Sequence, residues 1–291
     1  MHKQFEASAS GSKADIQSGV DISKVHGGYF SNLKNAQDFC DVGIAPIEKS
    51  LPVEMSYMDF GGGQGFLGRL VKEYLEGCGH TVTELIVDAN PSYLDVASKT
   101  GLHTKMENLE TGVFDAVDLI TIRAVLHYNL PEAQLAILKN VRQSLREGGF
   151  FVHQLSAARS LANNELRSAL VNIPSLGRDG SGSYNWISES DAMQLHLAAG
   201  FSNATVVGHA SSGSWGPESQ WTRFNENLEK AATTPEEIQT LLERKTLYIS
   251  QANAMIEEYV QRYGNEETGV EKLADGSYLV HYEYPIIVSK R

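Results

Sequence analysis

The chain has few cysteines, no cluster of basic residues and no long apolar run, and each of these absences excludes a class of protein. Its 24 Lys and Arg residues are outnumbered by 36 Asp and Glu, which gives a formal net charge of -12. The basic residues form no stripe with interleaved aromatics. Nucleic acid is therefore not an expected partner, because binding phosphates requires clustered positive charge.

The two cysteines, Cys40 and Cys78, lie in unrelated contexts and form no C-x-x-C pair, so neither a zinc site nor a disulfide framework is expected. No spaced His, Asp and Glu cluster indicates another metal. The stretch 1–19 is polar and lacks the apolar core of a signal peptide, and no apolar run approaches the ~20 residues that a membrane span needs. We expect a cytoplasmic protein with no metal and no membrane partner.

Strand and helix patterns alternate from residue 55 onward. Such alternation predicts an α/β fold, with a doubly wound and mostly parallel sheet covered by helices on both faces. Ligands of these sheets bind beyond the carboxyl ends of the strands, so residues that follow strands deserve the closest reading. The predicted strands are 55–60, 84–87, 103–106, 117–122, 150–155, 205–207 and 284–289, and the predicted helices are 67–75, 91–98, 131–145 and 188–199.

Two stretches, 157–187 and 210–276, interrupt this alternation and are mostly helical in pattern. We interpret them as insertions that form a lid over the mouth of the sheet, where enzymes often keep substrate selectivity. A dimerisation surface and plain packing helices are the alternatives. We expect one domain at 51–291 that includes both insertions. It is preceded by a flexible tail at 1–19 and a helical segment at 20–50.

The most informative segment is a glycine-rich turn, Asp59-Phe60-Gly61-Gly62-Gly63-Gln64-Gly65, between a strand and a helix start. Such a turn brings bare backbone amides and a positive helix end close to a ligand. Residues 63–68 fit the dinucleotide pattern G-x-G-x-x-G, which is weak in isolation. The overlapping residues 59–65 fit an acidic-x-G-x-G-x-G pattern. The turn alone therefore leaves the nucleotide open.

The order of motifs over 54–155 resembles the class I S-adenosylmethionine (SAM) methyltransferases. The matching stretches are 59–65, the acidic strand end Asp88 in 84–91, 107–109, 114–128, and Leu145-Arg146-Glu147-Gly148-Gly149-Phe150, with glutamate where the family usually has proline. The segment 284–291 is similar to the family's antiparallel seventh strand. The resemblance implies a seven-stranded sheet with an antiparallel last strand. It also disfavours a dehydrogenase, because a second nucleotide-binding half is missing after Leu155.

This resemblance implies SAM as the cofactor and carries roles over to particular residues. The glycines would admit the methionine and ribose portions, and Asp59 would hold the loop and attract the ligand's ammonium, or else cap the loop's own amides. Asp88 would accept both ribose hydroxyls, or else cap the next helix. Either Glu107 or Asn108 would contact adenine. The predicted cofactor residues are Asp59, Gly61, Gly62, Gly63, Gly65, Asp88, Ala89, Glu107, Asn108, Leu109 and Arg123.

The acceptor side is less defined by the sequence. His127 is the candidate general base, because it follows the central strand and an ordinary histidine pKa suits proton transfer; a structural hydrogen bond is the alternative. Arg123 could pair with an acid in the fold or face an anionic substrate group. The predicted substrate-binding residues are Tyr29, His127, Tyr184, Trp186 and Arg223, with core packing as the alternative for the aromatics.

The sequence thus predicts methyl transfer from SAM to an O, N or C nucleophile of a small-molecule acceptor, in secondary metabolism. One alternative is a methyltransferase-like protein that uses bound SAM for a non-methylating reaction such as cyclisation. Another is a non-catalytic SAM-binding protein. The length of the insertions also permits a homodimer.

Overall fold

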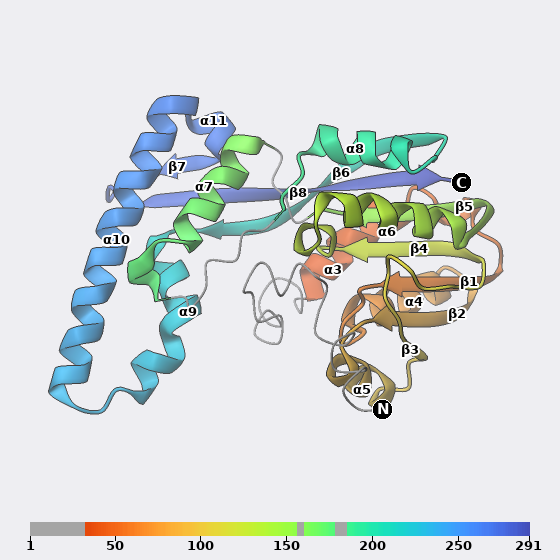
Figure 1. Ribbon diagram of the computed structural model, residues 1–291, viewed down its shortest axis with the longest axis horizontal. Helices are drawn as coiled ribbons and strands as arrows, with labels where there is room; N and C mark the ends of the chain where they lie inside the picture. Colours follow the sequence, from red (N-terminus) through yellow and green to blue (C-terminus); the bar gives the residue numbers. More distant parts are fainter. Residues whose placement is uncertain (1–32, 156–159, 178–184) are drawn as a thin grey trace.

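A computed structural model describes residues 33–155, 160–177 and 185–291, and its centre is one mixed sheet (Figure 1). The strand order is β3-β2-β1-β4-β5-β8-β6, with β7 paired to β8. Strands β3 to β5 along this order are parallel, and β8 runs antiparallel to both β5 and β6. The strands are β1 Glu54–Phe60, β2 Thr81–Asp88, β3 Thr104–Met106, β4 Val117–Arg123, β5 Leu145–Gln154, β6 Asn203–Trp215, β7 Val270–Lys272 and β8 Tyr278–Lys290.

The predicted fold class is confirmed, but the described sheet has eight strands rather than seven. The additional strand is the three-residue β7, which pairs with the first part of β8. Strand β8 begins at Tyr278, six residues before the predicted start at Tyr284. Its early part alternates buried Tyr278, Val280 and Tyr282 with less buried residues, which is the period-two pattern of a strand with one covered face.

Helices cover both faces of the sheet. On one face, α3 (Leu33–Phe39) and α4 (Phe66–Gly77) pack with β1, β4 and β5 around buried Phe39, Tyr57 and Val71. On the other, α6 (Pro131–Gln143) packs through Ile137, Leu138 and Val141 beside α8 (Glu189–Ala198). Helix α5 (Pro91–Lys99) follows β2. The described part of the predicted N-terminal helical segment runs from α3 through the π-helix Cys40–Ile44 and the 3-10 helix Glu48–Ser50.

One predicted boundary is wrong in an informative way. The sequence predicted a helix ending at 145 and a strand beginning at 150, with Gly148-Gly149 between them. Instead, α6 ends at Gln143 and β5 already begins at Leu145, which pairs with Val117 of β4. The glycines lie inside β5, where Gly148 has a φ of 80° and the register with β4 shifts. Glycine here permits an irregular strand rather than ending an element.

Both predicted insertions contribute to a second body, which we call the helical subdomain: α7 (Leu161–Val171), the 3-10 helix Pro174–Leu176, α9 (Pro217–Ala231), α10 (Pro235–Tyr263) and α11 (Asn265–Thr268). They pack with β7 and the outer part of β8 around buried Leu166, Trp221 and Tyr248. The first residues of the second insertion continue β6 as far as Trp215. Figure 1 shows this subdomain at the opposite end of the long strands β6 and β8 from the parallel strands.

A buried histidine pair links three elements of the core. Nδ1 of His153 in β5 lies 3.1 Å from Nε2 of His196 in α8, and Nδ1 of His196 lies 2.7 Å from Oγ of Ser289 in β8. Both rings stack on Phe151. Burial lowers the pKa of His153 well below its ordinary value and lowers the pKa of His196 to about 3. Both imidazoles are therefore neutral in the native state, and their role in the core is structural.

This pair should make stability fall in mild acid. The unfolded chain binds protons at these histidines below about pH 6.5 while the native chain does not, so each should remove up to about 1.4 kcal/mol of unfolding free energy per pH unit as the pH falls. Urea unfolding between pH 5 and 8 measures this. His196→Phe, which keeps a ring against Phe151, should lose less stability than the wild type over that range.

The comparison of variants removes the contribution of all other titrating groups, because those groups are unchanged by the substitution. His281→Gln, at a surface histidine whose side chain is 43% exposed, is the matched control and should follow the wild-type curve. Identical pH dependence in His196→Phe and the wild type would contradict a neutral buried pair.

Candidate functional site

The glycine loop after β1 adopts a conformation that only glycine accepts readily. Gly61, Gly63 and Gly65 have φ values of 68°, 55° and 77°. The amides of Gly61 and Gly62 both donate to the carbonyl of Val87 at the end of β2, at 2.8 and 3.1 Å. The loop is thereby held across the carboxyl ends of two adjacent strands, and Gly65 leads directly into α4.

The structure adds a reason for these glycines that the sequence did not reveal. A Cβ at Gly61 would lie 2.4 Å from Cγ2 of Val125, and one at Gly65 would lie 2.4 Å from Cδ1 of Leu102. The predicted reason was the approach of a ligand to the backbone. The loop is also so close to its own neighbours that side chains are excluded, which keeps the backbone low over the strand ends.

Asp88, at the end of β2, ties this loop to the next one. Its Oδ2 accepts from the amide of Gly63 at 2.9 Å, and its Oδ1 accepts from the amide of Asn90 at 2.8 Å. Burial raises the pKa of this carboxyl, and the amide hydrogen bonds oppose that rise. The alternative role as a helix cap is wrong, because Asn90 caps α5 by accepting from Ser92. Each oxygen keeps acceptor capacity toward a diol.

Asp59 lies beneath the loop rather than at its surface. Asp59 is only 1% exposed, and its Oδ1 accepts a hydrogen bond from Oγ1 of Thr121 at 2.7 Å. Tyr57 Oη is 2.7 Å from the same Thr121 hydroxyl. Burial raises the pKa of Asp59 to about 6, while Thr121 and the charge of Arg123 act in the opposite direction. This geometry suits holding the loop, and a direct contact with a ligand would require the carboxylate to become exposed.

The loop after β3 carries the predicted adenine contacts. The amide of Glu107 donates to the carbonyl of Asp88 at 3.2 Å, which holds the loop beside the end of β2. Oδ1 of Asn108 accepts from the amide of Glu110 at 2.7 Å, and Oε1 of Glu107 accepts from the amide of Asn108 at 3.1 Å. Leu109 packs partly buried against the core. Glu107, Asn108 and Leu109 thus lie next to Asp88 and Ala89, and the choice between Glu107 and Asn108 stays open.

Strand β4 ends in a strained residue next to the glycine loop. Ala124 has a φ of 58°, the one positive φ of a non-glycine residue in the described part of the chain. Its amide donates to the carbonyl of Gln154 at 3.1 Å, and the following Val125 covers Gly61. Backbone strain of this kind is concentrated at functional sites. Arg123, half-buried before it, lowers the pKa of Asp59 and so interacts with an acid in the fold.

Two predicted acceptor residues, His127 and Trp186, are brought together. Their rings stack with centroids 4.6 Å apart and an interplanar angle of 3°. His127 is 6% exposed in the 3-10 helix Leu126–Tyr128, and Nε1 of Trp186 donates to Oγ of Ser168 in α7 at 2.5 Å. The ordinary pKa expected for His127 is wrong. Burial, and then the charge of Arg167, lower it well below the usual value, so the ring is neutral at physiological pH.

The remaining predicted acceptor residues are more scattered. Tyr29 and Tyr184 lie outside the described residues. Arg223 is exposed on α9, with its guanidinium 5.7 Å from the ring centroid of Phe224. Sequence reasoning missed Arg167 of α7, which lies over the Trp186 ring at 4.9 Å. A single arginine between the apolar positions Leu166 and Leu170 was the available signal, but a helix pattern alone does not say what such a residue faces.

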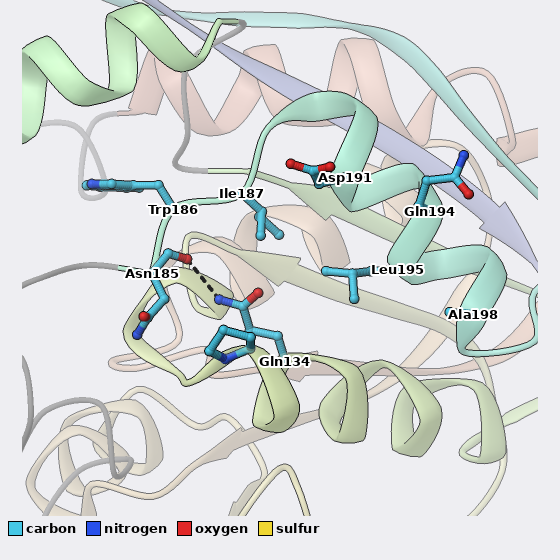
Figure 2. Close-up of a pocket in the computed structure, with 9 residues that line it drawn as sticks. Gln134, Asn185, Trp186, Ile187, Asp191, Gln194, Leu195 and Ala198 are labelled. Atoms are coloured by element: carbon cyan, nitrogen blue, oxygen red, sulfur yellow. Dashed lines mark hydrogen bonds between the residues drawn. The ribbon is translucent and has the colours of Figure 1, made fainter.

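A pocket of about 450 Å³ lies between α6 and α8, and Trp186 is one of the residues that line it (Figure 2). Gln134 forms part of its wall, and its Nε2 lies 2.8 to 3.0 Å from the carbonyl oxygens of Leu126, Asn129 and Asn185. These contacts position the segment that carries Trp186. Within residues 33–155, 160–177 and 185–291, no group of His, Cys, Asp and Glu has metal-binding geometry. In the same residues, no helix combines the length and apolarity required to cross a bilayer.

Solved structures with the same fold include several methyltransferases. The chain is similar to YcgJ from Bacillus subtilis, with a TM-score of 0.57, 16% identity, and coverage of 85% of this chain and 97% of that chain. A methyltransferase from Bacillus halodurans, described as putative, has a TM-score of 0.55 and 16% identity, with coverage of 88% of this chain and 98% of that chain. A sarcosine dimethylglycine methyltransferase from Galdieria sulphuraria, also described as putative, has a TM-score of 0.50 and 12% identity, with coverage of 88% of this chain and 85% of that chain. At these identities the likeness shows the fold. No curated protein matches the chain.

A family model described as a methyltransferase domain matches residues 33–206, more than half of the chain. The matched region contains the glycine loop, Asp88, the loop at Glu107 and the strained end of β4. These elements also fit the cofactor: the loop lies low over the strand ends, and Asp88 presents a carboxylate with acceptor capacity beside it. The chain therefore belongs to the methyltransferase-domain family, and its cofactor is S-adenosylmethionine.

Proposed function

We propose that the protein transfers a methyl group from SAM to a small-molecule acceptor held between the carboxyl ends of the strands and the helical subdomain. The observation that carries this proposal is the contact path from the cofactor loop to the acceptor side. Val125 covers Gly61, and two residues later His127 stacks on Trp186, which hydrogen-bonds to α7 of the subdomain. In this proposal the subdomain acts as the predicted lid, and the stacked rings of His127 and Trp186 exclude water from the reacting atoms.

Bound SAM supplies an electrophilic methyl group on a sulfonium. The residues of this chain align and desolvate the acceptor, effects that provide about 7–11 kcal/mol in well-oriented systems. The predicted cofactor residues Asp88, Glu107 and Asn108 hold the nucleoside end, while the strained Ala124 brings backbone next to Gly61. A neutral, buried His127 is a weak base, so we assign its ring to the wall against which the acceptor lies.

The small size of the acceptor is supported by the acidic chain, with its net charge of -12, and by an aromatic wall suited to a compact molecule. A protein of the same fold carries sarcosine and dimethylglycine in its name, which are small amines. A role in secondary metabolism, the O, N or C nature of the nucleophile, a homodimer and a cytoplasmic location stay predictions from the sequence. So does the absence of nucleic-acid partners.

Cofactor binding is tested by calorimetry with S-adenosylhomocysteine. The wild type should bind it in the micromolar range and should not bind NAD. Asp88→Ala should weaken binding at least tenfold, because it removes a charge-assisted acceptor worth about 1.5–3 kcal/mol. Asp95→Ala, at an exposed carboxylate on α5, is the matched control and should bind as the wild type does. Binding of NAD alone would contradict the proposal.

Catalysis is tested by a screen of small acceptors that detects the methylated product by mass. With the best acceptor, His127→Gln should lower kcat less than tenfold and leave its pH dependence between 6.5 and 8.5 unchanged. Loss of a general base would instead lower kcat by a factor of about 10² to 10⁴. It would also remove a fall in kcat toward acidic pH. A product without an added methyl group would favour a SAM-dependent reaction such as cyclisation, and cofactor binding without turnover would favour a binding protein.

A further inference from the structure

Gln134, the fourth residue of α6, is a fully buried polar side chain that contacts three carbonyl oxygens. Its Nε2 lies 3.0 Å from the carbonyl oxygen of Leu126, 3.0 Å from that of Asn129 and 2.8 Å from that of Asn185. Figure 2 shows the contact with Asn185, which joins α6 to the segment before α8. The two N–H groups of one amide thus serve three acceptors.

These contacts fix the orientation of the amide, because a flipped side chain would place Oε1 against three carbonyl oxygens. In the orientation adopted, Oε1 is buried and has no hydrogen-bond partner among the described residues. A buried acceptor without a partner destabilises the fold. An apolar side chain would avoid that cost but would lose all three contacts. The donors of Gln134 therefore account for an amide at this buried position.

The contacts of Gln134 converge on the stacked rings of His127 and Trp186. Leu126 directly precedes His127, and Asn185 directly precedes Trp186. The amide of Asn185 also donates to the carbonyl of His127 at 2.9 Å. Asn185 is thus held through its carbonyl by Gln134 and through its amide by His127. One glutamine amide therefore ties together the two backbone segments that carry the stack.

Hydrogen bonds have a larger part than usual in holding the segment that carries Trp186. Trp186 and Ile187 line the pocket of about 450 Å³ between α6 and α8, so one side of this segment faces a cavity. Close packing restrains side chains in protein interiors, and a cavity removes that restraint on one side. Two hydrogen bonds of the Asn185 backbone, and the one from Nε1 of Trp186 to Ser168, restrain the segment instead. Removal of the Gln134 amide should therefore loosen the segment.

The same side chain is connected to the cofactor loop. Nδ2 of Asn129, whose carbonyl contacts Gln134, donates to the carbonyl of Val125 at 3.0 Å. Val125 in turn covers Gly61. A continuous path of contacts thus leads from the glycine loop through Asn129 and Gln134 to the segment before α8. The position of the Trp186 ring is thereby defined relative to the cofactor loop.

We propose that Gln134 is a positioning residue for methyl transfer: its amide holds Trp186 in place against His127, and the ring so held aligns the acceptor with the cofactor. This inference rests on the proposed function, since it concerns the acceptor side of the same site. Gln134 acts through Trp186 rather than on the reacting atoms. Misplacement of aligned reactants by about 1 Å can cost about 10²-fold in rate, so a remote amide can have a large effect.

The test is a double-mutant cycle on kcat/KM, measured with the best acceptor from the screen described above. Gln134→Met keeps the length of the side chain but removes the amide, and it should lower kcat/KM by about tenfold or more. In a Trp186→Ala background the same substitution should change kcat/KM by less than about twofold, because the ring that Gln134 positions is already absent. A general contribution to the fold would instead give the same factor in both backgrounds.

A second measurement requires no acceptor. In protein labelled with 5-fluorotryptophan, the ¹⁹F resonance of Trp186 is assigned by its absence from Trp186→Phe. The resonance should shift in His127→Gln, because the stacked ring is lost. In a Gln134→Met background, His127→Gln should shift it by less than about half as much, since the two rings are no longer held together.

Two controls accompany these measurements. Gln194→Met makes the same change at an exposed glutamine of α8 that lines the same pocket, and it should keep the wild-type kcat/KM. Every variant is first titrated with S-adenosylhomocysteine, and unchanged affinity shows that the fold and the cofactor site are intact. If Gln134→Met fails this titration, the cycle is measured with Gln134→Asn, which keeps an amide but shortens its reach by one methylene.

The possible failures of this inference differ from those of the proposed function. Wild-type kcat/KM in Gln134→Met, or an equal loss with and without Trp186, would overturn the role of Gln134 and leave methyl transfer intact. Loss of cofactor binding in both Gln134 variants would also overturn it, because the amide would then support the whole fold. Absence of a methylated product from the wild type would overturn the proposed function, and the positioning role with it.

Discussion

The pairing of β8 with β5 and β6 is the constraint on which both halves of the molecule depend. The inner part of β8 places Ile286 and Val288 in the core of the sheet, while its outer part places Tyr278, Val280 and Tyr282 in the core of the helical subdomain. One hydrogen-bonded strand thus joins these two apolar clusters. Because a strand is stiff along its length, it fixes where α7 and its Arg167 lie relative to the ends of β4 and β5.

Buried polar groups at the mouth are arranged so that charge is concentrated in a few places. Asp88 is tied by backbone amides, and Asp59 interacts with Thr121 and Arg123 beneath the loop. The buried histidines instead stay neutral, since their surroundings offer stacking rings in place of carboxylates. The carboxylates thus lie on the cofactor side, and stacked aromatic rings lie on the acceptor side. This division is the physical basis for assigning the two sides different ligands.

Much of the fold was readable because local patterns repeat. The apolar strands β1, β2, β4 and β5 alternate with helices whose caps Asn90, Ser188 and Thr234 have recognisable chemistry. The errors occurred where glycines lie inside a strand, as at Gly148, and where a strand is rich in tyrosine, as at the start of β8. In both places tertiary pairing overrides the local signal, because the hydrogen-bond partners are distant in sequence.

The sequence by itself determined the fold class and the family, and it predicted the residues beside the cofactor, since strand ends such as Asp59–Gly65 and Asp88 follow directly from chain order. Only the tertiary structure decided what surrounds them: that Asp59 is buried, that His127 is neutral against Trp186, and that Arg167 lies over the Trp186 ring. Burial and electrostatic surroundings depend on contacts between segments far apart in the chain, and residue type alone does not encode them.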